Sequence, residues 1–472
     1  MRKSIRSAFP IIFVLVLQLL SSSPLCSQSS SAPRLVLISI DGLYPDIYRQ
    51  AVELELRVPS LESLVRDGVS ADGMIGIFPT VTFPSHAAII TGVRSYLNGI
   101  TGNITLGDGS PQGTWYWFSD SLLVPSLPEA AHRKGLKVAV SSWPSLCGAS
   151  YVDFSLPEIW TVEKGVTSRE LVFRYDTPGL TEKVESMYGP WTDKRFDWGY
   201  QDDRIADGAC ALIKLEKPNL LLVHLVEVDH VLHSFGRDSK EALKAFELAD
   251  AQVGRILDAL EEVGLRDSTN IIVVGDHGFA NIHNELRPNV ELGKLGVLES
   301  RDSRGKTQSS QTTGSPKSSP RATAFFRSSG GGGAVYFSQG SDTMAIADVI
   351  SHFKKLSETE YKRIFYVLDR KELQRYGAFP GAAFGLACEP GYTFSGGRAG
   401  NFLSPTESRG THGFLPENPL MYSGFIASGP SFKKGLRIPS ISILDVAPTA
   451  AKILGTSLGP QVEGKVREDI LK

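Results

Sequence analysis

The sequence has few cysteines, and cysteine chemistry does not define its fold. Only 4 of its 472 residues are cysteines. Three of these, Cys147, Cys210 and Cys388, lie beyond the N-terminal segment and lack the spacing of a zinc knuckle. At most one disulfide can form among three thiols, which excludes a disulfide-stapled scaffold. We expect the three side chains to be buried as small apolar groups.

The sequence also has almost no net charge, with a formal value of -2. This near neutrality excludes a polyanion-binding surface, so we expect no nucleic-acid duplex as a partner. Hydrophobic residues make up 42% and charged residues 21% of the chain. These proportions exclude a disordered or fibrous protein and are typical of a large globular enzyme.

No apolar run long enough to span a bilayer follows the N-terminal segment. That segment is typical of a signal peptide over residues 1–28, and it predicts export to the periplasm or the medium. Its basic start contains Arg2, Lys3 and Arg6, and an apolar stretch follows from Ile11 to Leu20. A region rich in small residues, Ser21 to Ser31, comes next, as expected around a cleavage site. The apolar stretch is shorter than the roughly 20 residues of a membrane span. An uncleaved anchor is the alternative.

Short apolar runs rich in β-branched residues recur between helical patterns and predict buried strands. They are Leu35 to Ile40, Val138 to Ser142, Leu220 to Val226, Ile271 to Gly275, Ala334 to Phe337, Ile364 to Leu368 and Gly424 to Ala427. Continuous hydrophobicity is typical of strands that helices cover on both faces. We therefore expect an α/β fold with a doubly wound, mostly parallel sheet. Residues 239–263 carry the helical period and end at Gly264.

One main domain is expected over residues 33–470, interrupted by a low-complexity insertion at 301–321. The insertion is rich in Ser, Thr, Gln, Gly, Lys and Pro and cannot bury enough apolar surface to fold. The glycine run Gly330 to Gly333 precedes an apolar strand, so it predicts a tight approach to a sheet. It does not match a phosphate-binding P-loop.

Acidic and imidazole side chains follow several of the predicted strands, where open α/β sheets bind their ligands. They are Asp41, the pair Asp229 and His233, the pair Asp276 and His277, and His412 in a Gly-Thr-His-Gly stretch. Each alone could be a helix cap or a hydrogen-bonded core residue. Together, three Asp and three His predict a site for two Zn²⁺ ions, with Mn²⁺ as the alternative metal.

The predicted nucleophile is Thr82, in the segment Phe-Pro-Thr-Val-Thr-Phe-Pro-Ser-His that precedes a helical stretch. A hydroxyl at a helix start gains from the local positive field, and a metal can lower its pKa enough to form an alkoxide. Thr80 and Ser85 are competitors that the residues alone do not exclude. A threonine that only caps the helix is the structural alternative.

These motifs, in this order, resemble the nucleotide pyrophosphatase/phosphodiesterase (type I phosphodiesterase) family of the alkaline phosphatase superfamily. The resemblance runs from about Leu35 to about Leu454. It rests on Asp41-Gly42, the segment around Thr82, Gly99 to Asn103, the Asp229 and His233 pair, Asp-His-Gly at Asp276 and Thr-His-Gly at His412. It implies an alkaline-phosphatase-like fold and a phosphodiesterase or nucleotide pyrophosphatase activity on small-molecule substrates.

The resemblance also implies roles for individual residues. Thr82 would attack phosphorus, become phosphorylated, and contact one metal held by Asp41, Asp276 and His277. Asp229, His233 and His412 would hold the second metal. Asn103 matches the family asparagine whose amide donates to a phosphate oxygen. A turn residue after glycine is the alternative for Asn103.

The sequence departs from the family pattern at positions that concern the substrate. Ser85 stands where the motif has Asn, and Val228 where it has Pro. Family members that bind a nucleobase place an aromatic residue after the nucleophile and a Tyr five residues before the second-site Asp. Phe83 keeps the first position and His224 occupies the second. We expect both to contact substrate, with a core role as the alternative for Phe83.

Two other activities and one non-catalytic role compete with this prediction. A phosphomonoesterase relative would carry a Lys-x-Arg pair near residues 141–145, which read Ser-Ser-Trp-Pro-Ser. A sulfatase would need a Cys or Ser in a C/S-x-P-x-R motif, which neither Cys147 nor Cys210 has. A binding protein on the same fold would have lost its nucleophile or several ligands. The sequence leaves the oligomeric state and the physiological substrate open.

Overall fold

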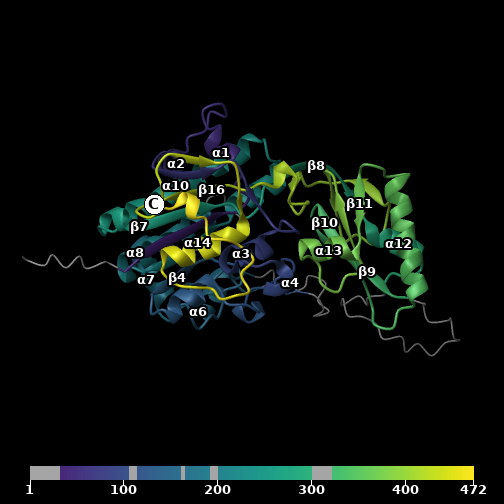
Figure 1. Cartoon of the computed structure of the whole chain (residues 1–472), viewed down its shortest axis with the longest axis horizontal. Helices are drawn as coiled ribbons and strands as arrows, with labels where there is room; N and C mark the ends of the chain where they lie inside the picture. The colour runs from purple at the N-terminus through teal and green to yellow at the C-terminus, as the bar shows by residue number, and fades with distance from the viewer. Residues whose placement is uncertain (1–31, 106–113, 161–164, 192–199, 300–321) are drawn as a thin grey trace, which may run out of the picture. The chain divides into compact units, whose positions relative to one another are not determined.

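The computed structural model describes residues 32–105, 114–160, 165–191, 200–299 and 322–472, within a unit that runs from Ala32 to Lys472 (Figure 1). The predicted signal peptide and the predicted insertion at 301–321 lie outside the described residues. In the described ranges, no helix combines the length and the apolar character that crossing a bilayer requires.

An eight-stranded sheet forms the centre of the fold. Its order is β17 (Leu436–Ile438), β2 (Gly68–Ala71), β16 (Phe425–Ser428), β7 (Thr269–Val274), β1 (Arg34–Ile40), β6 (Leu220–Leu225), β4 (Val138–Ser141) and β5 (Phe154–Leu156). All pairs from β7 to β5 are parallel, whereas β16 runs antiparallel to both of its neighbours. The predicted α/β class with a mostly parallel sheet is confirmed.

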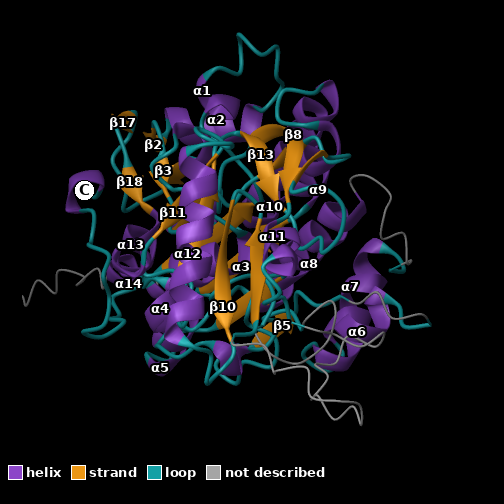
Figure 2. Cartoon of the chain, turned by 90° about the vertical axis from the view of Figure 1, so that its right-hand side faces the viewer, coloured by secondary structure: helices purple, strands orange, loops and turns teal. Residues whose placement is uncertain are grey.

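Helices cover both faces of this sheet, and strand β1 shows why its hydrophobicity is continuous. Leu35 and Leu37 join one buried cluster, and Val36, Ile38 and Ile40 join the other. Residues of α8 (Tyr200–Glu216), α9 (Glu227–Phe235) and α10 (Lys240–Glu262) pack in the second cluster, and residues of α5 (Leu127–Arg133) and α14 (Val446–Ile453) in the first. In Figure 2, the labels of α8, α9 and α10 lie to the right and those of α5 and α14 to the lower left. A doubly covered sheet needs apolar residues at every position.

Two of the predicted strands belong to a separate antiparallel sheet, which corrects the expectation that all seven share one sheet. This sheet has the order β11 (Phe365–Leu368), β12 (Phe384–Cys388), β10 (Gly332–Phe337) and β9 (Ala324–Ser329). Its core includes Phe353 of α12 (Thr343–Glu358) and Phe384. A short apolar run predicts a buried strand but carries no signal for the sheet that it joins.

A third sheet pairs the strand that follows β7 along the chain with strands from a distant part of the sequence. Strand β8 (Ala280–Leu286) pairs with β13 (Gly391–Phe394), β14 (Leu403–Pro405) and β15 (Gly410–Thr411). Gly410 lies opposite Asn281, and Thr411 lies opposite Ala280. Because β8 begins three residues after His277, this register brings residue 412 next to residue 277.

The remaining elements are short. They are α1 (Asp46–Arg49), α2 (Pro59–Arg66), β3 (Met74–Ile75), α3 (Thr82–Thr91), α4 (Ser95–Asn98), α6 (Ser168–Tyr175), α7 (Leu180–Tyr188), α11 (Pro288–Lys294), α13 (Arg370–Tyr376) and β18 (Ile441–Ser442). Strands β3 and β18 pair in parallel.

Several smaller predictions agree with the structure. The predicted helix 239–263 is α10, and its N-cap Ser239 accepts a hydrogen bond from the Ala242 amide at 3.1 Å. Cys147, Cys210 and Cys388 are free and buried. The glycine run lies where a side chain on Gly331 would meet the ring of Phe414. The tight approach predicted for this run is therefore present.

Candidate active site

The carboxyl ends of three neighbouring parallel strands carry most of the predicted metal ligands. Asp41 follows β1 directly, Asp276 comes two residues after β7, and α9 with Asp229 and His233 begins two residues after β6. Strands β7, β1 and β6 are adjacent in the sheet. Their ends therefore place these side chains at one edge, where α/β folds bind ligands.

Four side chains form what we call the Asp41 cluster: Asp41, Thr82, Asp276 and His277. His277 Nε2 lies 3.3 Å from Asp41 Oδ1, 3.2 Å from Asp276 Oδ2 and 3.4 Å from Thr82 Oγ1. All four side chains are buried. One donor atom from each of Asp41, Asp276 and His277 lies within 4.8 Å of the other two, close enough to share a metal ion.

Three side chains form what we call the Asp229 cluster: Asp229, His233 and His412. Asp229 Oδ1 lies 3.5 Å from His233 Nε2 and 3.6 Å from His412 Nε2. His277 adjoins this cluster as well, because its ring stacks on that of His412 with centroids 3.7 Å apart. Donor atoms of Asp229, His277 and His412 also lie within 4.8 Å of one another. The two clusters therefore meet at His277.

The loop that carries His412 is held in place by the segment before Thr82, the predicted nucleophile. Gly413 donates its backbone N–H to the Thr80 carbonyl at 2.9 Å, and Thr80 Oγ1 donates to the Phe414 carbonyl at 3.0 Å. Gly413 has φ 87° and touches the Ser329 backbone so closely that a Cβ atom would overlap it. Only glycine fits this conformation and this approach.

Each of the three histidines is oriented by a hydrogen bond from its Nδ1 to a backbone carbonyl. The acceptors for His233, His412 and His277 are Gly410, Thr80 and Gly278, at 2.9, 3.0 and 3.1 Å. A neutral imidazole that donates from Nδ1 presents the lone pair of Nε2. This arrangement is typical of metal-ligating histidines.

The three carboxylates each have a buried oxygen without a hydrogen-bond donor. These atoms are Asp41 Oδ1, Asp229 Oδ1 and Asp276 Oδ2. The other oxygen of Asp276 accepts the Gly42 N–H at 3.0 Å, and that of Asp41 is 3.2 Å from His224 Nε2. Buried carboxylate oxygens without donors are costly unless a cation balances them. The donor set of oxygen and imidazole nitrogen therefore fits divalent metal ions such as Zn²⁺.

The ionisation of the site follows from burial and from crowding of like charges. Burial and the neighbouring Asp276 raise the pKa of Asp41 well above its usual value. Burial raises the pKa of Asp276 to about 6 and lowers the pKa of His277 to about 4. Burial acts to raise the pKa of Asp229, but His233 and His412 outweigh it and lower that pKa to about 2. His277 is thus neutral near pH 7, the form that binds metal.

The Thr82 hydroxyl contacts His277 of the cluster, whereas no such contact is found for the hydroxyls of Thr80 and Ser85. Thr82 is the first residue of α3, and the helix has no side-chain cap. Thr80 donates to the Phe414 carbonyl, and the Ser85 hydroxyl is fully buried without a partner. A Thr82 that merely caps the helix does not fit this geometry.

Asn103 lies beside the first turn of α3. The Phe83 backbone N–H donates to Asn103 Oδ1 at 3.0 Å. Because the amide oxygen is engaged there, the NH₂ group of Asn103 points to the opposite side and remains a donor. The side chain is partly exposed.

The predicted substrate contacts of Phe83 and His224 do not fit the structure. Phe83 is 1% exposed and packs against Trp115 and Trp117. His224 is fully buried on β6, with Nδ1 2.7 Å from Glu158 Oε2 and Nε2 3.2 Å from Asp41 Oδ2. Neither ring presents a face to solvent. Sequence spacing identified the position of His224 but could not show that two carboxylates enclose it.

Three tryptophans that the sequence reasoning missed pack together around Phe83. Trp115 and Trp117 stack with centroids 5.4 Å apart, and Trp160 meets Trp115 edge-on at 4.6 Å. Trp115 and Trp160 are partly exposed, whereas Trp117 is buried. The Trp-x-Trp spacing at 115–117 was the available signal. Partly exposed aromatic side chains can stack on planar groups.

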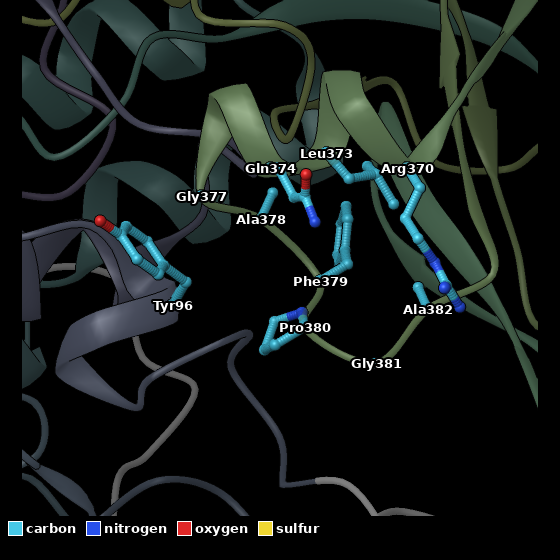
Figure 3. A pocket seen from close by; sticks show the side chains of 10 residues that line it. All are labelled: Tyr96, Arg370, Leu373, Gln374, Gly377, Ala378, Phe379, Pro380, Gly381 and Ala382. Carbon is cyan, nitrogen blue, oxygen red and sulfur yellow. The ribbon is translucent and has the colours of Figure 1, made fainter.

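A cavity of about 600 Å³ lies apart from these ligands, between α4 and α13. Figure 3 shows Tyr96 on one side and Gln374, Phe379 and Arg370 on the other. None of the predicted site residues lines it. Phe379 connects the wall of this cavity to the segment before Thr82, because the Phe379 ring packs on the ring of Phe78 with centroids 5.3 Å apart.

Comparisons with known proteins show which family the chain resembles. The chain is 23% identical to Bis(5'-adenosyl)-triphosphatase of Mus musculus over 443 residues, which cover 92% of this chain and 80% of the relative. It is 24% identical to Venom phosphodiesterase of Naja atra over 272 residues, 56% of this chain. That match spans only about a quarter of the venom enzyme, 28% of its length.

A solved structure of murine ectonucleotide pyrophosphatase / phosphodiesterase 5 has the same fold. Its TM-score is 0.63 at 17% identity, over 93% of this chain and 100% of that chain. An inactive Thr-to-Ala form of the murine protein in complex with AMP has a TM-score of 0.62. The profile of the type I phosphodiesterase / nucleotide pyrophosphatase family matches residues 35–415, a range that contains every residue of both clusters. The chain therefore belongs to the type I phosphodiesterase / nucleotide pyrophosphatase family.

Proposed function

We propose that this protein is an exported two-zinc hydrolase that cleaves phosphodiester or phosphoanhydride bonds through a phosphothreonine at Thr82. The observation that carries the proposal is the position of Thr82 Oγ1, 3.4 Å from His277 Nε2, where the Asp41 and Asp229 clusters meet. A hydroxyl between two sets of metal ligands is the arrangement that in-line phosphoryl transfer requires.

One ion would be held by Asp41, Asp276, His277 and Thr82, and the other by Asp229, His233 and His412. Oxygen and imidazole ligands favour Zn²⁺, with Mn²⁺ as the alternative. When bound, the ions lower the pKa of the Thr82 hydroxyl and stabilise the charge on the attacking and leaving oxygens.

Residues of the chain itself would position the nucleophile and the phosphate group. Thr82 stands at the N-terminus of α3, whose field favours an anionic oxygen there. Its Oγ1 would form a bond to phosphorus while the bond from phosphorus to the leaving oxygen breaks, and water would then release the remaining phosphate monoester and restore the Thr82 hydroxyl. The Asn103 amide donates to a non-bridging phosphate oxygen, and the Phe83 N–H fixes that amide in orientation.

The substrate is a small-molecule diester or nucleotide in this proposal. A terminal phosphate carries extra charge that needs cations, and the strand end at residues 141–145 offers none. The partly exposed faces of Trp115 and Trp160 provide a stacking surface near α3 for a planar group. The AMP complex of the murine relative supports a nucleotide substrate for this chain as well.

The test compares hydrolysis of bis-p-nitrophenyl phosphate and p-nitrophenyl phosphate by the zinc-loaded protein. We expect the diester to be preferred, and Thr82→Ala to lower its turnover by about 10⁴-fold or more, because the nucleophile is lost. A preference for the monoester would replace the diesterase with a phosphomonoesterase. No Thr82-dependent activity, together with less than one zinc per chain, would instead favour a binding protein on this fold.

A further inference from the structure

His224 lies between two carboxylates that come from different strands. Its Nε2 is 3.2 Å from Asp41 Oδ2, and its Nδ1 is 2.7 Å from Glu158 Oε2. The His224 side chain is 1% exposed, and those of Asp41 and Glu158 are 6% and 10% exposed. Such a chain of buried hydrogen bonds holds each group in one orientation.

The sheet explains how the three residues come together. Residue 224 of β6 pairs with residue 39 of β1, so His224 lies next to the end of the strand that Asp41 follows. Glu158 comes two residues after β5, the edge strand, which lies beyond β4 on the side of β6 away from β1. The bridge therefore crosses the carboxyl edge of the sheet from β5 to β1.

The hydrogen bond to His224 leaves Asp41 with one free oxygen. Oδ2 is engaged with His224, whereas Oδ1 has no hydrogen-bond partner and lies 3.3 Å from His277 Nε2. Rotation of the Asp41 carboxylate would move Oδ1 away from the cluster. Partners that fix a metal ligand in this way commonly contribute 10- to 100-fold to metal affinity.

The neighbouring His86 does not provide an alternative support for Asp41. Its ring lies 4.1 Å from that of His224, but its Nδ1 donates to the Thr82 carbonyl at 2.8 Å. Its Nε2 is buried without a hydrogen-bond partner. The bridge through His224 is thus the fixed support for the Asp41 carboxylate.

We propose that His224 and Glu158 are positioning residues that aim Asp41 Oδ1 at the ion of the Asp41 cluster. The proposal rests on the two-metal site proposed above. The same bridge anchors the segment that leads to Trp160, two residues after Glu158, to the metal centre. His224 then acts on the reaction through Asp41 and does not contact the substrate.

The experiment measures zinc affinity by chelator competition in the full-length protein. All variants carry His233→Ala as well, because this substitution weakens the Asp229 cluster and leaves the Asp41 cluster intact. The zinc that remains tightly bound in this background therefore reports on the Asp41 cluster. In this background we compare Glu158→Ala, Glu158→Gln, His224→Leu and His224→Gln. His352→Gln is the matched control, because it also removes a histidine that pairs with a glutamate. His352 lies on α12, and its Nε2 is 3.0 Å from Oε2 of Glu291 on α11.

We expect Glu158→Ala to weaken zinc binding about 10-fold and His224→Leu about 100-fold. Glu158→Gln keeps an acceptor for Nδ1, and His224→Gln keeps a donor for Asp41, so each should restore affinity to within about 3-fold of the parent. The control should not change it. In proteins with an intact His233, kcat should fall in the same order while KM changes little.

Unchanged zinc affinity in both Glu158→Ala and His224→Leu would overturn the proposal. If His224→Leu does not fold, as judged by thermal unfolding of the metal-free protein, Glu158→Ala decides alone, because Glu158 lies at the outer end of the bridge. Failure of the proposed function looks different: the parent protein itself would then bind no zinc tightly.

Discussion

The two ligand clusters differ in how the fold encloses them. In the Asp41 cluster the side chains of Asp276 and His277 are fully buried, and that of Asp41 is 6% exposed. In the Asp229 cluster the side chain of His233 is 36% exposed and that of Asp229 is 13% exposed. One cluster is closed around its donors, and the other opens to solvent at His233. We therefore expect substrate and exchanging ions to enter on the Asp229 side.

The difference follows from the elements that carry the ligands. Asp41, Asp276 and His277 follow strand ends that their neighbours in the sheet hold in place. Asp229 and His233 lie one turn apart on the short helix α9. Asp202 supports the start of that helix, because it accepts the N–H groups of Val226 and Glu227 at 2.7 and 3.3 Å. The closed cluster depends on the sheet, and the open one depends on this helix.

The largest effect on zinc content should come from His277, the residue at which the clusters meet. His277→Ala removes a donor from both sets, so we expect less than one tightly bound zinc per chain. Loss of metal stabilisation worth several kcal/mol should lower diesterase turnover about 10³- to 10⁴-fold. His233→Ala should keep one zinc, and added zinc should recover much of its activity. Metal analysis with turnover at increasing zinc concentration separates the two variants.

The exposed His283 of β8 gives the matched control for these two substitutions. His283→Ala should keep two zinc ions and full activity. Two tightly held ions in His277→Ala would contradict the shared position of His277. Equal losses in His277→Ala and His233→Ala, without recovery by zinc, would erase the distinction between a closed and an open cluster.

A smaller effect should come from Asn103, the proposed donor to the phosphate, which is not among the predicted metal ligands. Asn103→Ala should lower kcat about 10²- to 10³-fold, because one donor to the phosphate is lost. Asn103→Asp keeps an acceptor for the Phe83 N–H but has no amide donor, and it adds a negative charge. Its kcat should fall at least as far. Both variants should retain two zinc ions by metal analysis. Loss of an ion would show that Asn103 contributes to metal binding.

Sequence reasoning could locate the strands and the candidate ligands because both leave local signals. A buried strand followed by Asp or His, as at Asp41 and Asp276, predicts a position at the sheet edge without knowledge of the rest of the fold. It could not assign Ala334 to Phe337 to the second sheet, since pairing partners lie far away in the chain. The proximity of His412 and His277 likewise follows from the register of β15 on β8.

The surroundings of a side chain were the other limit of the sequence. Phe83 and His224 occupy positions that the family resemblance links to the substrate, yet packing turns both into buried residues. The contact of His224 with Glu158 joins residues 66 positions apart. No periodicity or motif encodes such a contact, because β5 and β6 are brought together only by the order of strands in the sheet.

The smallest effect on catalysis, and a direct test of the helix that supports the open cluster, comes from Asp202. Burial, with the neighbouring Glu227, raises the pKa of this carboxyl to about 7. The folded protein therefore holds the proton at pH values where the unfolded chain has released it. This stabilises the fold fully below about pH 4, and the effect is lost as the pH rises to about 7.

Asp202→Asn removes this pH dependence while its amide oxygen still accepts the N–H groups of Val226 and Glu227. The free energy of unfolding of the metal-free variant should therefore exceed that of the parent by about 4 kcal/mol at pH 8, and the difference should shrink towards pH 4. Urea denaturation at both pH values measures it. Diesterase activity should change less than 3-fold, since α9 keeps its support. A difference that is the same at both pH values would show that Asp202 is ionised in the fold, and that the start of α9 is held by a charge.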